Sequence, residues 1–329
     1  MSNKKRILTG DRPTGNLHLG HYLGSLKNRV ELQNDYESYI IIADVQALTT
    51  HWEKDENLKN DIYQITLDYL AAGIDPEQST IFIQSMIPEI HELTMYFALY
   101  TSVNVLRHNP TIKAEAEQHG FKDLTYGFLG YPVSQTADIS IFKAHLVPVG
   151  EDQIPHIELA RKIIRRFNDL YAPVLVEPEA LIGEVPRLVG LDGNNKMSKS
   201  LNNAIYLKDS KDEIAKKINN AVTDPARIRK DDPGHPEVCS VYQYQKIFNP
   251  AEVAQIEADC RAGQIGCVAC KKNLTGKIDE LLEPMRERRA NYTEDMVKDI
   301  LLAGTKKAHN VALATMEEVR EAMKISYFK

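Results

Sequence analysis

The fold is decided by residues 6–30, which read RILTGDRPTGNLHLGHYLGSLKNRV. A short apolar run ends at Gly10, and a turn-rich loop follows over residues 11–16. Apolar residues then recur at helical spacing, at Leu19, Leu23, Leu26 and Val30. The stretch therefore predicts a strand, a loop and a helix in immediate succession.

The same alternation continues to about residue 200. Residues 39–44 read Tyr-Ile-Ile-Ile-Ala-Asp, an isoleucine-rich run closed by an aspartate, which is typical of a strand buried on both faces of a parallel sheet. Further strands are predicted at 79–84 and 146–150, with helical spacing between them. We therefore predict an α/β fold with an open parallel sheet and right-handed crossovers. Such a sheet binds ligands beyond the carboxyl ends of its strands, near residues 10–16.

The strand pattern stops beyond Ser200. Helical spacing takes over in residues 211–222, 273–289 and 293–323. We therefore expect two domains, an α/β domain over residues 1–200 and a helical domain over residues 201–329.

Composition narrows the class of protein. The chain has 329 residues, of which 43% are hydrophobic and 26% charged, which excludes a disordered or fibrous protein. Its net charge of −6 argues against nucleic-acid binding through overall charge, so local basic patches would be needed. No apolar run approaches the roughly 20 residues of a membrane span, and no signal-peptide core precedes the first strand. We expect a cytoplasmic protein with no membrane partner.

Two polar motifs suggest a nucleotide site. His18 and His21 stand three residues apart at a predicted helix start, and Gly20 between them would let a ligand approach the backbone. Two lysines, also three apart, occur in the polar loop Lys196-Met197-Ser198-Lys199-Ser200, which suits a mobile clamp for a polyphosphate. Either motif alone is equally typical of solvated residues, but the two together favour a nucleoside triphosphate site.

All four cysteines lie in one stretch, as Cys239, Cys260, Cys267 and Cys270, with 20, 6 and 2 residues between them. Four thiolates from one segment can bind a tetrahedral zinc ion or a [4Fe–4S] cluster. Four buried cysteines without a ligand are the alternative, which the closing Cys-x-x-Cys disfavours.

The sequence resembles the class I aminoacyl-tRNA synthetases of the Trp/Tyr subgroup, and within it the tryptophanyl-tRNA synthetases. The resemblance covers nearly the whole chain and rests on Gly10-x-Arg-Pro-Thr-Gly15, His18-Leu-Gly-His21, Tyr131-Pro-Val-Ser-Gln135-x-Ala-Asp138, Val147-Pro-Val-Gly150-Glu-Asp-Gln153 and Lys196-Met-Ser-Lys-Ser200. It implies a Rossmann-like catalytic domain followed by a helical domain that binds the tRNA anticodon. It also implies a homodimer, to which the apolar helix at 95–103 is a plausible contributor.

The resemblance further implies a reaction in two steps. The carboxylate of L-tryptophan attacks the α-phosphorus of ATP, which gives tryptophanyl-adenylate and pyrophosphate, and the acyl group then passes to the 3′ end of tRNA(Trp). Mg²⁺ would accompany the nucleotide. The implied catalytic residues are His18, His21, Lys196 and Lys199. The implied ATP-binding residues are Arg12, Pro13, Thr14, Gly20, His21, Gly150, Glu151, Asp152, Gln153, Leu188, Lys196, Met197, Ser198, Lys199 and Ser200.

Tryptophan selection is expected to depend on Asp138, whose carboxylate can accept the indole N–H. Tyr131, Gln135 and Gln153 complete the implied tryptophan site. Arg12 and Gln135 depart from the pattern, because many bacterial tryptophan enzymes carry Gln and Met there.

The cysteines match a subgroup of the family that carries a [4Fe–4S] cluster, although the first gap is two residues shorter here, so zinc stays open. Three other functions are alternatives that the motifs disfavour. The run at 147–153 and the cysteines argue against a tyrosyl-tRNA synthetase, and the lysine loop with the extra helical domain argues against a small-molecule adenylyltransferase. The intact histidine and lysine motifs argue against an RNA-binding or regulatory paralogue that does not charge tRNA.

Overall fold

A computed structural model gives the structure of the chain. It describes residues 4–50, 52, 56–150, 153–182, 188–193, 197–198 and 201–328.

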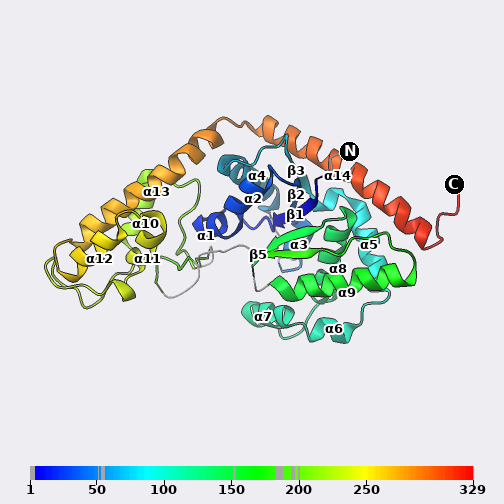
Figure 1. Cartoon of the computed structure of the whole chain (residues 1–329), viewed down its shortest axis with the longest axis horizontal. Coiled ribbons are helices and arrows are strands. Elements are labelled where there is room, and N and C mark those ends of the chain that lie inside the picture. The colour runs from blue at the N-terminus through cyan, green and yellow to red at the C-terminus, as the bar shows by residue number, and fades with distance from the viewer. Residues whose placement is uncertain are drawn as a thin grey trace.

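The centre of the protein is a five-stranded sheet in which every pairing is parallel (Figure 1). Its strands are β1 (Arg6–Asp11), β2 (Glu37–Ile42), β3 (Ser79–Ile83), β4 (Leu146–Val149) and β5 (Glu179–Ile182). Their spatial order is β3-β2-β1-β4-β5, with β1 in the middle. The predicted α/β fold with an open parallel sheet is confirmed.

The middle strands are buried on both faces, as the apolar run in β2 predicts. Tyr39 and Ile41 point into one hydrophobic core, while Ile40 and Ile42 point into a second core on the other face. This alternation follows from the period of two along a strand.

Helices follow the strands on both faces. After β1 come α1 (Leu19–His21), a π-helical turn η1 (Tyr22–Leu26) and α2 (Lys27–Leu32). The connections between β2 and β4 contain α3 (Asp44–Leu48), α4 (Leu58–Ala72), η2 (Gln84–Met86), α5 (Pro88–Ala98), α6 (Val103–Arg107), α7 (Pro110–His119) and α8 (Tyr126–Ile141). α9 (Ile154–Leu170) joins β4 to β5.

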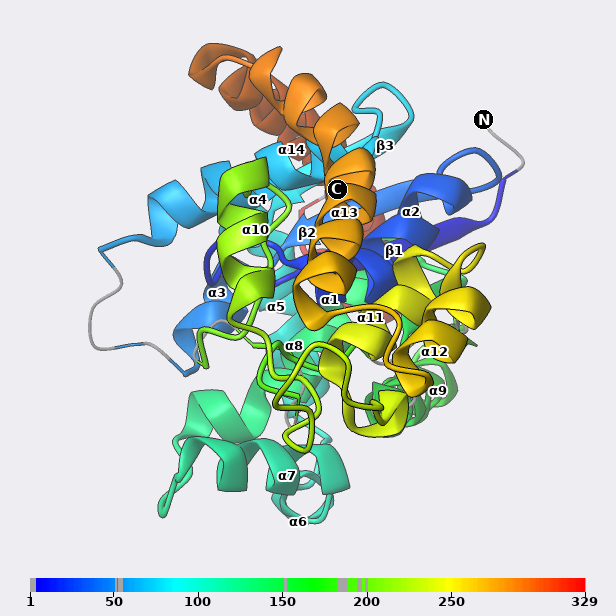
Figure 2. The same cartoon turned by 90° about the vertical axis from the view of Figure 1, so that its left-hand side faces the viewer.

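The C-terminal part of the described chain is helical, as expected. It contains α10 (Lys211–Asn219), η4 (Pro236–Val238), α11 (Ser240–Phe248), α12 (Val253–Arg261), α13 (Cys267–Ala290) and α14 (Glu294–Ala322). Helices α10 to α12 gather at one end of the molecule, and α13 leads from there back toward the sheet (Figures 1 and 2). Within the described residues, no helix combines the length and apolar character needed to cross a bilayer.

The last helix returns to the sheet and packs on its edge strand. A Cβ atom at Gly304 of α14 would lie 2.0 Å from the backbone oxygen of Ile81 in β3. The hydroxyl of Thr305 accepts a hydrogen bond from the N–H of Ile83 at 3.4 Å. Helix α14 therefore covers an edge that would otherwise expose unpaired backbone groups.

We predict that Gly304→Ala lowers the free energy of unfolding by about 1–3 kcal/mol, because the added methyl group has no room beside the β3 backbone. Gly276→Ala in α13 is the matched control. It meets nothing within 4 Å, so it should raise stability by up to about 1 kcal/mol. Urea unfolding of both variants measures the difference, and equal effects would contradict the close packing of α14 on β3.

Candidate functional site

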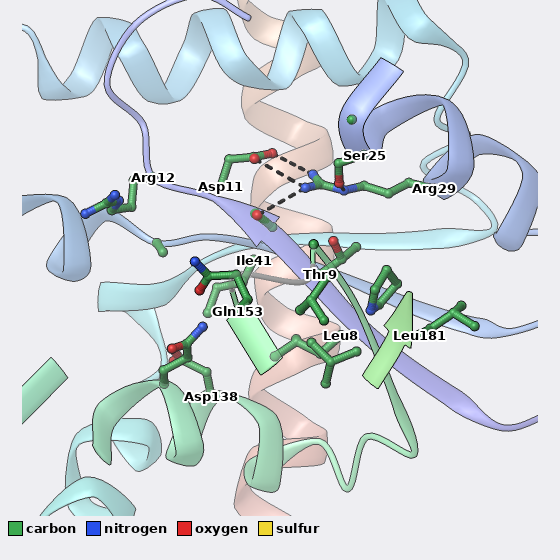
Figure 3. A pocket seen from close by; sticks show the side chains of 18 of the residues that line it. Leu8, Thr9, Asp11, Arg12, Ser25, Arg29, Ile41, Asp138, Gln153 and Leu181 are labelled. Atoms are coloured by element: carbon green, nitrogen blue, oxygen red, sulfur yellow. Dashed lines mark hydrogen bonds and ion pairs between the residues drawn. The ribbon is translucent and has the colours of Figure 1, made fainter. Parts of the chain in front are cut away.

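A pocket of about 630 Å³ opens at the carboxyl ends of β1 and β4 (Figure 3). β1 pairs with β2 on one side and with β4 on the other, so the chain leaves β1 in one direction and later returns to its opposite side. Parallel sheets bind ligands at such a reversal of strand order. The pocket therefore lies where the sequence places a ligand site.

The proposed tryptophan-site residues converge on this pocket. Tyr131, Gln135 and Asp138 of α8 line it together with Gln153, which directly precedes α9. Three of the expected nucleotide contacts belong to the lining, namely Arg12, Gly150 and Gln153, which is expected to contact both substrates.

Asp138 lies at the base of the pocket with only 3% of its surface exposed. Both carboxylate oxygens accept hydrogen bonds from the side-chain amide of Gln84, at 2.9 and 3.0 Å. Burial raises the pKa of Asp138 to about 7; the Gln84 amide opposes this rise, and the negative charge of Asp44 adds to it. The carboxylate therefore takes up a proton near neutral pH.

The other polar groups of α8 offer a donor and an acceptor. The Tyr131 hydroxyl lies 2.8 Å from Nε2 of His156, and burial raises the pKa of this tyrosine well above its usual value. Oε1 of Gln135 is buried and has no hydrogen-bond partner among the described residues. A ligand that brings a donor to Gln135 would satisfy it.

A buried ion pair forms another wall of the pocket. Arg29 of α2 donates to both carboxylate oxygens of Asp11, at 2.5 and 3.2 Å, and to the Gly10 carbonyl (Figure 3). The Tyr69 hydroxyl donates to Asp11 at 2.8 Å. Burial opposes the ionisation of Asp11, but Arg29 overcomes it and the pKa falls to about 2.

The two histidines of the first motif lie together. Their ring centroids are 3.7 Å apart, and the backbone N–H of His18 donates to Nδ1 of His21 at 3.2 Å. The residues on either side of His18 are hydrogen-bonded to residues that follow the lysine loop. Leu19 N–H donates to the Ile205 carbonyl at 2.9 Å, and Leu207 N–H donates to the Leu17 carbonyl at 3.0 Å.

The described part of the lysine loop packs against the histidine turn. The Cβ atom of Met197 lies 3.6 Å from the position that a Cβ atom of Gly20 would occupy. The N–H of Met197 donates to the Leu188 carbonyl at 3.4 Å, and Ser198 N–H donates to the Asn203 side chain at 2.8 Å. The two motifs, far apart in sequence, therefore meet in space.

Several of the expected catalytic and ATP-binding residues do not line the pocket. The pocket lining does not include Pro13, Thr14, His18, Gly20, His21, Leu188, Met197 or Ser198. Glu151, Asp152, Lys196, Lys199 and Ser200 lie outside the described residues.

Four residues that support the site were not predicted from the sequence, namely Gln84, Asp11, Arg29 and Asp68. Arg29 had one available signal, because it stands directly before Val30 and three residues after Leu26, on the apolar side of the predicted helix. Asp68 accepts the Leu17 N–H at 2.7 Å and is ion-paired with Arg289 of α13.

The four cysteines are free thiols at partly buried positions. Burial raises the pKa of Cys270 to about 11, and the nearby thiols of Cys239, Cys260 and Cys267 add to the rise. Across the described part of the chain, no three His, Cys, Asp or Glu side chains are placed to hold a metal ion.

Comparison with known proteins gives a consistent family. Residues 2–283 match the sequence model of the tRNA synthetases class I (W and Y). A tryptophan–tRNA ligase of Clostridium longisporum is 50% identical over 335 residues, which is 99% of this chain and 98% of the relative. One of Lactococcus lactis is 49% identical, with 99% of both chains covered. The solved structure of tryptophanyl-tRNA synthetase from Campylobacter jejuni, complexed with ADP and tryptophan, superposes with a TM-score of 0.87 at 30% identity, and covers 97% of this chain and 99% of its own.

Proposed function

The chain belongs to the class I tRNA synthetases of the tryptophan and tyrosine group and has tryptophan–tRNA ligase activity, and we propose which of its residues bind tryptophan and which bind ATP. The enzyme activates L-tryptophan with ATP and then transfers it to tRNA(Trp). In our proposal, the pocket between β1 and α8 holds the amino acid, and the turn after β1 together with the lysine loop holds the triphosphate.

The buried carboxylate of Asp138 carries the tryptophan assignment. It lies deep in a pocket of a size that fits a large side chain, and it can accept the indole N–H. The unsatisfied Oε1 of Gln135 supplies an acceptor for the α-ammonium group of tryptophan. Tyr131 and Gln153 complete the site. An analogue without the indole N–H would leave the buried carboxylate unpaired, so the enzyme should strongly prefer tryptophan to such an analogue.

The phosphate side is supported by the contact between the two motifs. We place the phosphates of ATP at His18, Gly20 and His21, and we assign Lys196 and Lys199 to the charge that develops on pyrophosphate. Met197, Ser198 and Ser200 extend the lysine loop. Arg12, Pro13, Thr14, Leu188 and the run 150–153 flank the rest of the nucleotide. Mg²⁺ bound to ATP would neutralise part of the phosphate charge, and no step is assigned to a protein carboxylate around it.

We further propose that the enzyme is a cytoplasmic homodimer, with residues 1–200 as catalytic domain and 201–329 as the anticodon-binding domain. Helix α5 and the start of α6 support the dimer, because the exposed apolar side chains of Met95, Leu99 and Val103 would be covered in it.

We also keep the four-cysteine site as a proposal. Its support is the sequence pattern, which closes with Cys267-x-x-Cys270 at the start of α13. In the described residues no three side chains of this kind are placed to hold a metal ion. A [4Fe–4S] cluster or a zinc ion there would join η4, α12 and α13 and would take no part in the reaction.

The first prediction tests Asp138. Because its pKa is about 7, kcat/KM for tryptophan should rise as pH increases through 7 and the carboxylate forms. Asp138→Asn should remove this dependence and raise KM for tryptophan about 10- to 100-fold, the value of a hydrogen bond to a charged group. KM for ATP is the internal control. A tryptophan KM equal to that of the wild type would refute the assignment.

The second prediction tests the lysine loop through ATP–pyrophosphate exchange. Lys196→Ala should slow tryptophan-dependent exchange by roughly 10²–10³-fold, because it removes a charge that acts on the transition state. Lys211→Ala is the control, since this exposed lysine of α10 pairs with Asp279 in α13. Unchanged exchange in Lys196→Ala would exclude the role.

The third prediction concerns the cysteines. Protein purified without oxygen should contain either iron and sulfide with absorbance near about 400 nm, or about one zinc ion per chain. The Cys270→Ser variant should lose the bound cluster or zinc ion, while it continues to charge tRNA with tryptophan. Absence of both absorbance and zinc in the wild type would end the proposal.

A further inference from the structure

The tryptophan pocket has a buried neighbour that the known chemistry does not use. Gln84 begins η2, directly after β3, and its side chain is fully buried. It does not line the pocket and would not touch tryptophan. Its only described side-chain partners are Asp138 and the backbone of Gln46.

The orientation of the Gln84 amide is fixed by chemistry. The backbone N–H of Gln46 can only donate, and it points at Oε1 of Gln84 at 3.2 Å. The amide nitrogen must therefore face Asp138, where it donates to both carboxylate oxygens. The side chain of Gln84 thus links Asp138 of α8 to the start of α3 through hydrogen bonds.

The groups around Asp138 disfavour its negative charge, so the Gln84 amide is needed as a hydrogen-bond donor that supports ionisation. Asp44 of α3 is buried and repels a negative charge on Asp138, and its own oxygen accepts the N–H of Ser85 at 2.9 Å. The remaining charged or titratable groups that line the described pocket are Asp11, Arg12, Lys27, Arg29, Glu31, Glu115 and Tyr131, the last of which is hydrogen-bonded to His156. Among the described residues, Gln84 supplies the hydrogen bonds that favour the ionised form of Asp138.

We propose that Gln84 is a positioning residue for tryptophan selection, which fixes the orientation of the Asp138 carboxylate and supports its negative charge so that it receives the indole N–H. The inference rests on the proposed role of Asp138. It adds a residue from a different element, the η2 turn after β3, whose effect reaches the amino acid but not ATP.

Gln84→Met removes the amide at nearly constant volume. Without the donor, Asp138 should ionise at higher pH, so the rise of kcat/KM for tryptophan should move above pH 7, by up to about one pH unit. At pH 7 we expect KM for tryptophan to rise about tenfold, with KM for ATP unchanged. Selectivity against an analogue with benzothiophene in place of indole should fall. Gln84→Glu should shift the profile further, because a second carboxylate faces Asp138.

Gln33→Met is the matched control. Gln33 is also buried, and it bonds to Gly73, Asp75 and Ser79 at the opposite end of β3. It should lower thermal stability without moving the pH profile or the tryptophan KM. If Gln84→Met behaves as Gln33→Met does, Gln84 is merely structural and the inference is overturned.

The Asp138→Asn variant separates the two possible failures. If it has no effect on tryptophan KM, the proposed role of Asp138 fails and the inference falls with it. If Asp138→Asn weakens tryptophan binding while Gln84→Met leaves the pH profile and selectivity unchanged, only the inference on Gln84 is wrong.

Discussion

The site depends on the position of β1 between β2 and β4. Since all strands are parallel, their carboxyl ends share one edge, and the reversal of strand order at β1 opens a pocket there. The Asp11–Arg29 pair stabilises this point, because it joins the end of β1 to the first helix through Gly10 and Asp11. Removing either partner would leave the other charge buried and unpaired, which is costly.

The turn that we propose for the phosphates is held in place by three segments that are distant in sequence. One carboxylate oxygen of Asp68 in α4 accepts the Leu17 N–H, and the other forms an ion pair with Arg289 of α13. The backbone of residues 205–207 is hydrogen-bonded to that of residues 17–19. Arg286 of the same helix donates to the Asp209 carbonyl at 3.1 Å. The turn that contains His18 is therefore held by α4, by the segment after the lysine loop and by the C-terminal half of α13.

The sequence allowed the sheet, the helical C-terminal part and the main motifs to be predicted, because each has a local signal. The apolar run at 39–44 indicates a buried parallel strand, and the histidine and lysine motifs have fixed spacings. The roles of Gln84, Asp68 and Gly304 could not be predicted, since each depends on a contact with a segment 38 or more residues away. A buried glutamine or a helical glycine has no local pattern that distinguishes it from an ordinary surface residue.

The pKa values of two carboxyl groups in the pocket are shifted in opposite directions. The pKa of Asp11 is lowered and that of Asp138 is raised, so the two groups affect stability in different ranges of pH. Asp11 has a folded-state pKa of about 2, below its ordinary value of 3.8. Its ion pair therefore stabilises the fold fully above pH 3.8 and is lost as pH falls toward 2. Asp138 has a folded-state pKa of about 7, so its contribution to stability is lost as pH rises through 7. The native state has therefore lost this stabilisation by the pH at which Asp138 acquires the charge that we propose binds tryptophan. A donor that reaches this carboxylate favours its ionised form, so indole binding and deprotonation of Asp138 must promote each other.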